Sequence, residues 1–284
     1  MGQPVWLVEL IKWAFPARFL IARATRLPIL GPLLDRWFFA ADALIYLPTD
    51  RSIQIGYALE LEGQMVLPSE VVDHFIRRAS THWIMNRCLC RDAAGCSDYP
   101  VELGCLFLGA AADGINPKLG RRVTEQEALA HVQRCREAGL VHLIGRNKLD
   151  TIWLGVGPGD QLMTICHCCP CCCLWRVLPS MAPQSAAKVA RMPGVTVVVN
   201  DQCDGCGVCA EAICFVKAIE LVDGRARISE ECRGCGRCVT ACPNGAIEMR
   251  IAVDDCVLAA VEHLSPHVDL TQPFHDPAER DYAG

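Results

Sequence analysis

The chain has 284 residues, of which 52% are hydrophobic and 21% are charged, a balance typical of a folded protein rather than a disordered one. Its formal net charge of −5 leaves no excess of basic side chains to neutralise phosphates, which excludes nucleic acid as the main partner. Twenty cysteines are several times the number that packing requires, and they indicate either disulfides or metal-bound thiolates.

The start of the chain does not resemble a secretory signal. No basic segment precedes an apolar run, and Glu9, Lys12 and Arg18 interrupt the apolar residues that follow. The longest stretch without a charge, residues 161–175, is too short to span a bilayer as a helix. We therefore expect a cytoplasmic protein whose cysteines are reduced and bind metal.

Residues 1–80 are predicted to form a helical, amphipathic N-terminal region. Within it, residues 5–48 are rich in Trp, Phe, Leu and Ile, with arginines between them and prolines that interrupt the helical pattern. A basic, aromatic stretch of this kind is typical of segments that lie in a bilayer interface or dock on a partner subunit. Peripheral membrane contact through residues 5–48 is therefore one hypothesis, subunit docking is a second, and simple packing over the rest of the protein is a third.

Residues 81–176 combine regular structure with eleven cysteines. Thr124 and Glu127 form a capping-box pattern, which predicts a helix that ends at Gly139. Short apolar runs predict three strands, at residues 140–144, 151–154 and 162–166. The expected fold class is therefore α+β, with a helical, cysteine-rich N-terminal region followed by a second module.

Ten of these cysteines lie at spacings that packing does not explain. These candidate metal ligands are Cys88, Cys90, Cys96, Cys105, Cys166, Cys168, Cys169, Cys171, Cys172 and Cys173. If the downstream run is extended, Cys166 and Cys168 point to one side while Cys169, Cys171 and Cys173 point to the other. One strand would then serve two metal centres, and ten cysteines suffice for one or two additional iron–sulfur clusters.

Two other hypotheses fit the same cysteines, namely a structural zinc site and a dithiol redox centre. His167, inside the downstream run, either ligates iron or forms a hydrogen bond nearby. Arg87 and Arg91 either donate hydrogen bonds to cluster sulfurs or are solvated surface charges. Cys135 and Cys256 are predicted to be buried structural residues, since each belongs to an apolar helical pattern.

The remaining chain divides into three parts. Residues 177–194 contain three prolines and a glycine and are predicted to be a linker. Residues 195–252 contain an internal repeat, and residues 253–284 are predicted to be a C-terminal helix and tail. Outer strands are expected at residues 195–199 and 247–251, and a hairpin is expected between the two repeats, where Asp-Gly stands at 223–224.

Each repeat contains a CxxCxxC triplet followed by one more cysteine and then Ala-Ile-Glu. This segment resembles the bacterial-type dicluster ferredoxin family, whose fold is a two-fold βαβ repeat. The second half, Cys232-x₂-Cys235-x₂-Cys238-x₃-Cys242-Pro243, matches the family pattern at every ligand. The resemblance implies two [4Fe–4S] clusters, each taking its fourth ligand from the other repeat. It implies one cluster on Cys203, Cys206, Cys209 and Cys242, and another on Cys232, Cys235, Cys238 and Cys214.

The first half departs from the family pattern at three positions. Four residues rather than three separate Cys209 from Cys214, Phe215 stands where proline is usual, and Lys217 fills a position where glycine is usual. One extra residue displaces a thiolate by about 1.5 Å along a helix, which a loop adjustment can absorb, so Cys214 is retained as a ligand. Zinc is the alternative, but triplets with a remote fourth cysteine favour iron–sulfur clusters.

The function expected from these features is single-electron transfer by an iron–sulfur protein or subunit. Its partner would be a redox protein or a larger oxidoreductase complex, with no nucleic acid involved. The first alternative is an oxidoreductase with a catalytic cluster at residues 166–173. The second is a carrier of metal ions or clusters on thiolates. Whether the chain is itself an enzyme stays open at this stage.

Overall fold

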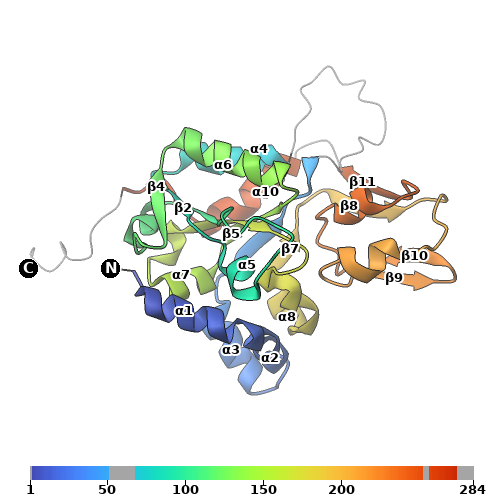
Figure 1. The fold of residues 1–284 in the computed structure, drawn as a ribbon, viewed down its shortest axis with the longest axis horizontal. Helices are drawn as coiled ribbons and strands as arrows, with labels where there is room; N and C mark the ends of the chain where they lie inside the picture. The colour runs from blue at the N-terminus through green and yellow to red at the C-terminus, as the bar shows by residue number, and fades with distance from the viewer. Residues whose placement is uncertain (1, 51–67, 252–255, 274–284) are drawn as a thin grey trace, which may run out of the picture.

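The computed structural model describes residues 2–50, 68–251 and 256–273, and it has a mixed α/β architecture (Figure 1). Its centre is a seven-stranded sheet in the order β4-β2-β3-β6-β5-β1-β7. The pair β1 and β7 is parallel, and every other neighbouring pair is antiparallel. The strands are β1 (Ala43–Tyr46), β2 (His82–Met85), β3 (Leu106–Leu108), β4 (Gly120–Val123), β5 (Val141–Arg146), β6 (Met163–Cys168) and β7 (Val189–Arg191).

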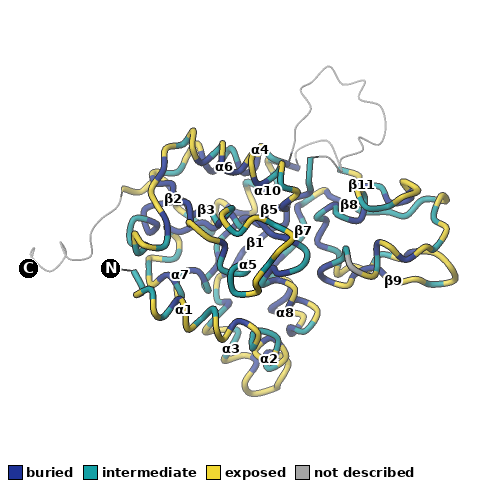
Figure 2. Tube along the Cα trace, viewed as in Figure 1, coloured by how far each residue is buried: buried dark blue, intermediate teal, exposed yellow. Residues whose placement is uncertain are grey.

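The inner strands of the central sheet are buried on both faces, as the dark strands in Figure 2 show. Side chains alternate along a strand, so Ile45 and Leu47 lie in one apolar core while Leu44 and Tyr46 lie in another. Three helices cover the first face, α4 (Ser69–Arg78), α6 (Glu125–Glu137) and α10 (Cys256–Leu264). The other side carries α1 (Val5–Ala14), α2 (Arg18–Ala24), α3 (Leu30–Phe38), α5 (Leu89–Ala94), α7 (Lys148–Leu154) and α8 (Pro183–Ala186).

The predicted helix after Thr124 is confirmed as α6. The Thr124 hydroxyl accepts the N–H of Glu127 at 3.2 Å, and the Glu127 carboxylate accepts the N–H of Thr124 at 2.9 Å. The strands predicted at 140–144 and 162–166 are confirmed as β5 and β6. The strand predicted at 151–154 is wrong, because these residues form the end of α7, capped by the side chain of Asn147.

The prediction of an entirely helical region at residues 1–80 is only partly right. Helices α1 to α4 are present, but residues 43–46 form β1, which pairs with β5 and β7 inside the sheet. All four side chains of β1 are buried, so this short apolar run is stabilised by its sheet neighbours rather than by helical periodicity. The part of the prediction that falls on residues 51–67 lies outside the described residues.

The prediction of a linker at residues 177–194 is wrong. The segment contains the end of the 3₁₀ helix η5 (Leu174–Ser180), then α8, then β7. Val177 and Leu178 are buried in the core that contains Tyr46, and β7 extends the sheet as its edge strand. Prolines mark the turns between these short elements, and the apolar residues between them pack onto the sheet. Other 3₁₀ helices in the described residues are η1 (Phe15–Ala17), η3 (Ala110–Gly114), η4 (Gly159–Gln161) and η7 (Ser265–His267).

The cysteine repeat forms two small antiparallel pairs beside the large sheet (Figure 1). The predicted outer strands are confirmed as β8 (Val195–Val199) and β11 (Ile247–Ile251), which pair with each other. The predicted hairpin is confirmed as β9 (Ile219–Val222) and β10 (Arg225–Ile228). Its turn residues Asp223 and Gly224 both have positive φ, 51° and 72°, as a type I′ turn requires.

The repeat is packed against the rest of the chain through both apolar cores. Val195 and Met249 belong to the core under α4 and α10, while Phe215 and Val216 belong to the core that contains Tyr46. The predicted C-terminal helix is present as α10, and residues 252–255 and 274–284 lie outside the described part of the chain. Among the described residues, no helix has both the length and the apolar character needed to cross a bilayer.

Gly145 provides a test of the contact between β1 and β5. It has φ 145°, and a Cβ atom there would collide with the carbonyl oxygen of Ala43 on β1. We expect Gly145→Ala to lower the free energy of unfolding by about 3 kcal/mol, because strand separation and an unfavourable φ add together. Urea unfolding under anaerobic conditions would measure this loss.

Gly139→Ala is the matched control, because Gly139 has φ 73° but nothing lies within 4 Å of the added Cβ. This control should lose only about 1 kcal/mol, the conformational cost alone. Equal losses in the two variants would contradict the close approach of β1 and β5.

Candidate metal centres

The first cysteine quartet surrounds a small cavity inside the repeat. Cys203, Cys206 and Cys209 line it together with Cys242 from the second repeat. Burial raises the pKa of the Cys209 thiol, and the nearby charges of the other three cysteines raise it further. The structure therefore brings together the four residues expected from the resemblance.

In the second quartet the two repeats exchange roles: the triplet comes from the second repeat and the fourth cysteine comes from the first. Burial raises the pKa of Cys238 well above the usual thiol value, and Cys235, Cys232 and Cys214 reinforce the shift through their charges. Burial likewise raises the pKa of Cys235 to about 11. Cys214 of the first repeat thus lies with the triplet of the second, so the two quartets are interleaved.

Backbone N–H groups point at a sulfur in each repeat. Ala218 donates to Cys214 at 3.2 Å, and Ala246 donates to Cys242 at 3.3 Å, both across four residues. Ala226 donates to Cys203 at 3.3 Å, and Gly234 donates to Cys232 at 3.4 Å. Hydrogen bonds of this kind stabilise the thiolate form that binds metal.

The extra residue before Cys214 is accommodated by a wider helical turn. Cys209–Ile213 form the π-helix η6, while the equivalent segment of the second repeat is the α-helix α9 (Arg237–Ala241). A π turn takes one more residue than an α turn. Cys214 and Cys242 then adopt nearly the same backbone conformation, φ −82° and ψ 100° against φ −72° and ψ 115°.

The two other residues that differ from the family pattern, Lys217 and Phe215, also affect the structure only locally. Lys217 has φ 53° and occupies the conformation that Gly245 adopts at φ 61° in the second repeat, so a lysine is held where glycine is favoured. Phe215 directs its ring to Tyr46, with ring centroids 5.0 Å apart. The backbone path is therefore conserved between the repeats, and the side chain at 215 gains a contact that proline could not make.

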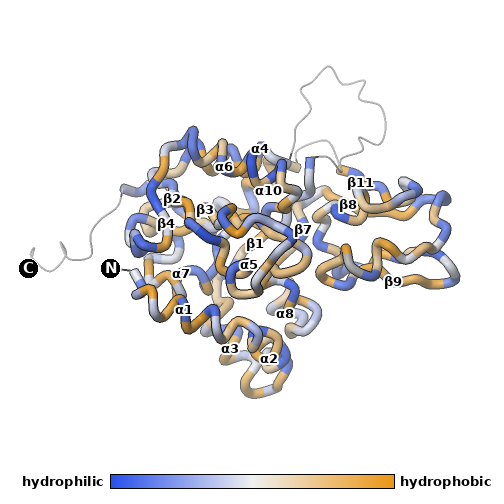
Figure 3. The backbone as a smooth tube through the Cα atoms, in the orientation of Figure 1, coloured by the Kyte–Doolittle hydropathy of each residue, from blue (hydrophilic) through white to orange (hydrophobic). Residues whose placement is uncertain are grey.

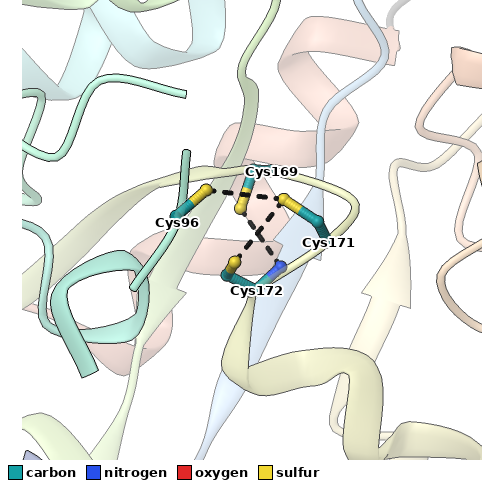
Figure 4. A group of neighbouring side chains, drawn as sticks. All are labelled: Cys96, Cys169, Cys171 and Cys172. Atoms are coloured by element: carbon teal, nitrogen blue, oxygen red, sulfur yellow. Dashed lines mark hydrogen bonds between the residues drawn. The ribbon is translucent and has the colours of Figure 1, made fainter. Parts of the chain in front are cut away.

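Four upstream cysteines converge on one point, as Figure 4 shows. The sulfurs of Cys96, Cys169, Cys171 and Cys172 all lie within 4.8 Å of one another. Cys96 is 3.6 Å from Cys171, and Cys171 is 3.5 Å from Cys172. We call this set the four-thiol group. Its spacing fits a tetrahedral thiophilic ion, and it offers the number of thiolates that one cubane cluster takes.

The remaining six upstream cysteines form a second set, which we call the six-thiol group. It links segments that are far apart in sequence, since Cys105 lies 3.7 Å from Cys166 and Cys173 lies 3.3 Å from Cys168. Cys88 accepts hydrogen bonds from Cys105 and Cys90. Its members are Cys88, Cys90, Cys105, Cys166, Cys168 and Cys173.

Two sulfurs of the six-thiol group are predisposed to be thiolates. Hydrogen bonds from Cys105 and then Cys90 lower the pKa of Cys88 well below the usual thiol value. Hydrogen bonds from Cys166 and then Cys173 do the same for the pKa of Cys168. A thiolate is the form that ligates metal, so the group is suited to a thiophilic centre even before all six thiols ionise.

The predicted division of the downstream run is wrong for one residue. Cys166 and Cys168 do point to one side, but Cys173 joins them instead of lying with Cys169 and Cys171. The strand β6 ends at Cys168, and the following residues turn at Pro170. Strict alternation holds only along an extended strand, and the turn carries Cys173 back to the side of Cys168.

The two arginines near Cys88 have different environments. Arg91 is completely buried and donates to the carbonyl oxygens of His167, at 2.7 Å, and of Leu103. It therefore joins strand β6 to the segment that contains Leu103, and its charge helps to lower the pKa of Cys88. Arg87 instead forms an exposed ion pair with Asp92 at 2.6 Å, which makes it a surface residue.

His167 lies on the opposite face of β6 from Cys166 and Cys168, as alternation requires. Its Nδ1 is 2.9 Å from Nδ1 of His142. His131, Cys135 and His167 place three ligand atoms within 4.8 Å in the buried interior. However, Nε2 of His131 contacts the carbonyl oxygen of Gly104 at 2.8 Å, so we interpret the trio as a hydrogen-bonded core cluster.

The cysteines predicted to be structural are both buried. Cys135 is wholly inaccessible and lies 3.7 Å from Nε2 of His131. Cys256 packs in the core under α4. All twenty cysteines of the sequence fall in the described part of the chain, and none of them forms a disulfide. Eighteen of them thus belong to four sulfur groups, two in the repeat and two upstream.

Tyr46 is a site residue that the sequence did not reveal, since it lies in a segment predicted to be helical. Its hydroxyl is 3.7 Å from the sulfurs of both Cys168 and Cys173, and its ring contacts Phe215, the neighbour of Cys214. Arg237 of the second repeat adds another link, because it donates to the carbonyl oxygen of Cys168. The six-thiol group is therefore linked to the Cys214 quartet through the side chains of Tyr46 and Phe215.

Comparison with known proteins gives one match. The family model for 4Fe-4S binding domains matches residues 227–248, which contain the second triplet and Cys242. No curated protein and no solved structure matched the chain. The match and the sulfur groups together indicate an iron–sulfur binding protein with at least one cluster.

The interleaved quartets predict the effect of removing a fourth ligand. We expect Cys214→Ser and Cys242→Ser each to lose up to about four iron atoms per chain, because each leaves one triplet without its fourth thiolate. Iron and acid-labile sulfide analysis after anaerobic purification would measure the loss. Cys135→Ala is the control and should keep its full iron content; an equal loss in this control would contradict the assignment.

Proposed function

We propose that this chain is an electron-transfer protein or subunit with a ferredoxin-like dicluster module, and that it moves single electrons between two [4Fe–4S] clusters in the module and further clusters on the upstream cysteines. Each bound cluster would accept and release one electron at a time. The observation that carries the proposal is the continuous contact from Cys214 through Phe215 and Tyr46 to Cys168 and Cys173.

The module supports this proposal through its ligand sets. Two interleaved quartets, each supported by backbone N–H donors to sulfur, suit two cubane clusters. Both quartets are lined by apolar residues such as Ile219 and Ile247. An apolar lining lowers the cost of reorganising solvent when the charge changes. Protein groups that donate or accept protons are not required for such a reaction.

The upstream groups support an extension of the electron path beyond the module. The four-thiol group offers the number of ligands that one further cubane needs. The six-thiol group offers more than one cubane needs, so it would hold either a larger cluster or a cubane with two unligated cysteines. Arg91, buried between the two groups, compensates part of their negative charge.

The cysteines also indicate the cellular compartment and the kind of partner that we propose. None of the described cysteines forms a disulfide, which favours a reducing, cytoplasmic compartment. An electron-transfer subunit also requires a redox partner, either a separate protein or a larger oxidoreductase complex. Cys206 is an exposed ligand of the first quartet, so the end of the module that carries it is the natural point for electrons to enter or leave.

The number of clusters can be tested directly. Anaerobically purified protein should contain about sixteen iron atoms per chain, eight in the module and eight upstream, with matching acid-labile sulfide. About eight iron atoms would restrict the electron path to the module. A composition dominated by zinc would overturn the proposal and would favour a thiolate metal carrier or a structural zinc protein.

Tyr46 tests the link between the module and the upstream sulfurs. We expect Tyr46→Phe to keep the ring contact with Phe215 but to lose the hydroxyl contacts with Cys168 and Cys173. Loss of a hydrogen bond to a charged sulfur, about 1.5 kcal/mol, should lower the reduction potential of the upstream centre by about 60 mV. EPR-monitored redox titration would measure the shift while the module signals stay unchanged.

Tyr99→Phe is the matched control, because Tyr99 packs beside the four-thiol group and not beside Cys168. This variant should leave the potential of the six-thiol centre unchanged. A Tyr46→Phe protein with every centre at its original potential would show that the hydroxyl does not act on the upstream cluster.

A further inference from the structure

The helices α1, α2 and α3 form a lobe at the lower edge of the molecule in Figure 1, and Figure 3 shows it as largely apolar. We call residues 5–38 the N-terminal lobe. Its surface carries most of the exposed large apolar side chains found in the described part of the chain. They are Trp6, Leu10, Trp13, Leu20, Ile21, Leu27, Ile29, Leu30, Leu33 and Trp37.

The apolar side chains that are spaced along one face of α1 and α3 point to solvent and not to the protein core. Trp6, Leu10 and Trp13 follow the spacing i, i+4 and i+7 on α1, and Leu33 and Trp37 are four residues apart on α3. Such a stripe normally faces the protein core. Here it faces outward, with exposed fractions of 67% for Trp6 and 79% for Trp13. Patches of this kind mark interaction sites rather than ordinary surface.

Polar contacts hold the lobe in this orientation. Lys12 on α1 pairs with Asp92 on α5 at 2.7 Å, and Asp35 on α3 pairs with Lys188 at 2.7 Å. Arg26 donates to the carbonyl oxygen of Met181 at 3.0 Å. These contacts lie on the inner side of the lobe, so the helices cannot turn their apolar stripes inward without breaking them.

The lobe carries more basic than acidic side chains, so it is suited to a negatively charged surface. Glu9 and Asp35 are its only acidic residues, and each is paired with a lysine, at 2.6 Å to Lys12 and 2.7 Å to Lys188. Exposed arginines remain at positions 23 and 36. Tryptophans between arginines are typical of helices that lie at the boundary between lipid headgroups and acyl chains.

We propose that the N-terminal lobe rests on the surface of a bilayer that contains anionic lipids, with its tryptophans inserted at the headgroup level. The helices have only 10, 7 and 9 residues, so they lie along the surface and do not cross it. Lys12 connects α1 to α5, which carries Cys90 of the six-thiol group. Membrane attachment thus places that group near the bilayer, and it does not depend on the proposed electron transfer.

Vesicle binding by the full-length, anaerobically purified protein tests this proposal. Vesicles of phosphatidylcholine with about 30% phosphatidylglycerol should carry the protein to the top of a flotation gradient, and raised salt should weaken the binding. Pure phosphatidylcholine should bind at least tenfold more weakly. Absence of the protein from the floated anionic vesicles would overturn the proposal.

Substitutions inside and outside the lobe test whether the lobe itself binds the vesicles. Trp6→Ser combined with Trp13→Ser should lower the partition coefficient at least tenfold, while Ile152→Ser combined with Leu258→Ser should leave it unchanged, although these two residues are also exposed. Iron content and circular dichroism should be the same in both. Equal binding by the two double variants would overturn the proposal, as would a stable dimer in solution that the lobe variant alone dissociates.

Discussion

Thiolates that lie sulfur against sulfur in a protein interior repel one another, and most of them stay protonated unless a cation compensates their charge. This constraint governs the whole molecule. Eighteen cysteines lie in four groups, and burial with mutual repulsion raises the pKa of members such as Cys171 and Cys238. Buried arginine supplies only part of the missing charge. Metal ions would supply the rest, and the fold is therefore expected to depend on them for stability as well as for function.

In the two repeats, the fourth cysteine has nearly the same backbone conformation, whereas the chain that leads to it differs. A π turn, a lysine with positive φ and a phenylalanine in place of proline all occur between Cys209 and Ala218. Nevertheless Cys214 and Cys242 have matching backbone conformations and matching N–H donors four residues later. The direction of the cysteine side chain is therefore the same in both repeats, although a π turn leads to it in one repeat and an α turn in the other.

The large sheet serves as the frame that unites the sulfur groups. It brings the end of β6 beside the loop around α5, and it places Tyr46 of β1 between the upstream sulfurs and Phe215. Because β1, β5 and β6 are adjacent and buried on both faces, these positions are held by packing on every side. On the outer side, the N-terminal lobe turns apolar helical stripes away from this frame, and its ion pairs keep it there.

Local patterns were enough to predict some parts of this protein. The CxxCxxC triplets, the Asp-Gly turn and the capping box of α6 each depend on residues a few positions apart, so their geometry is written in the spacing. Long-range contacts decided the rest. Strand β1 and the segment at 177–194 are stabilised by distant sheet neighbours. The turn at Pro170 decides which group Cys173 joins, and the position of Tyr46 between two sulfur groups follows from strand order. The contacts of β1 and of Tyr46 join residues more than a hundred positions apart, and no local spacing encodes which side chains tertiary packing brings together.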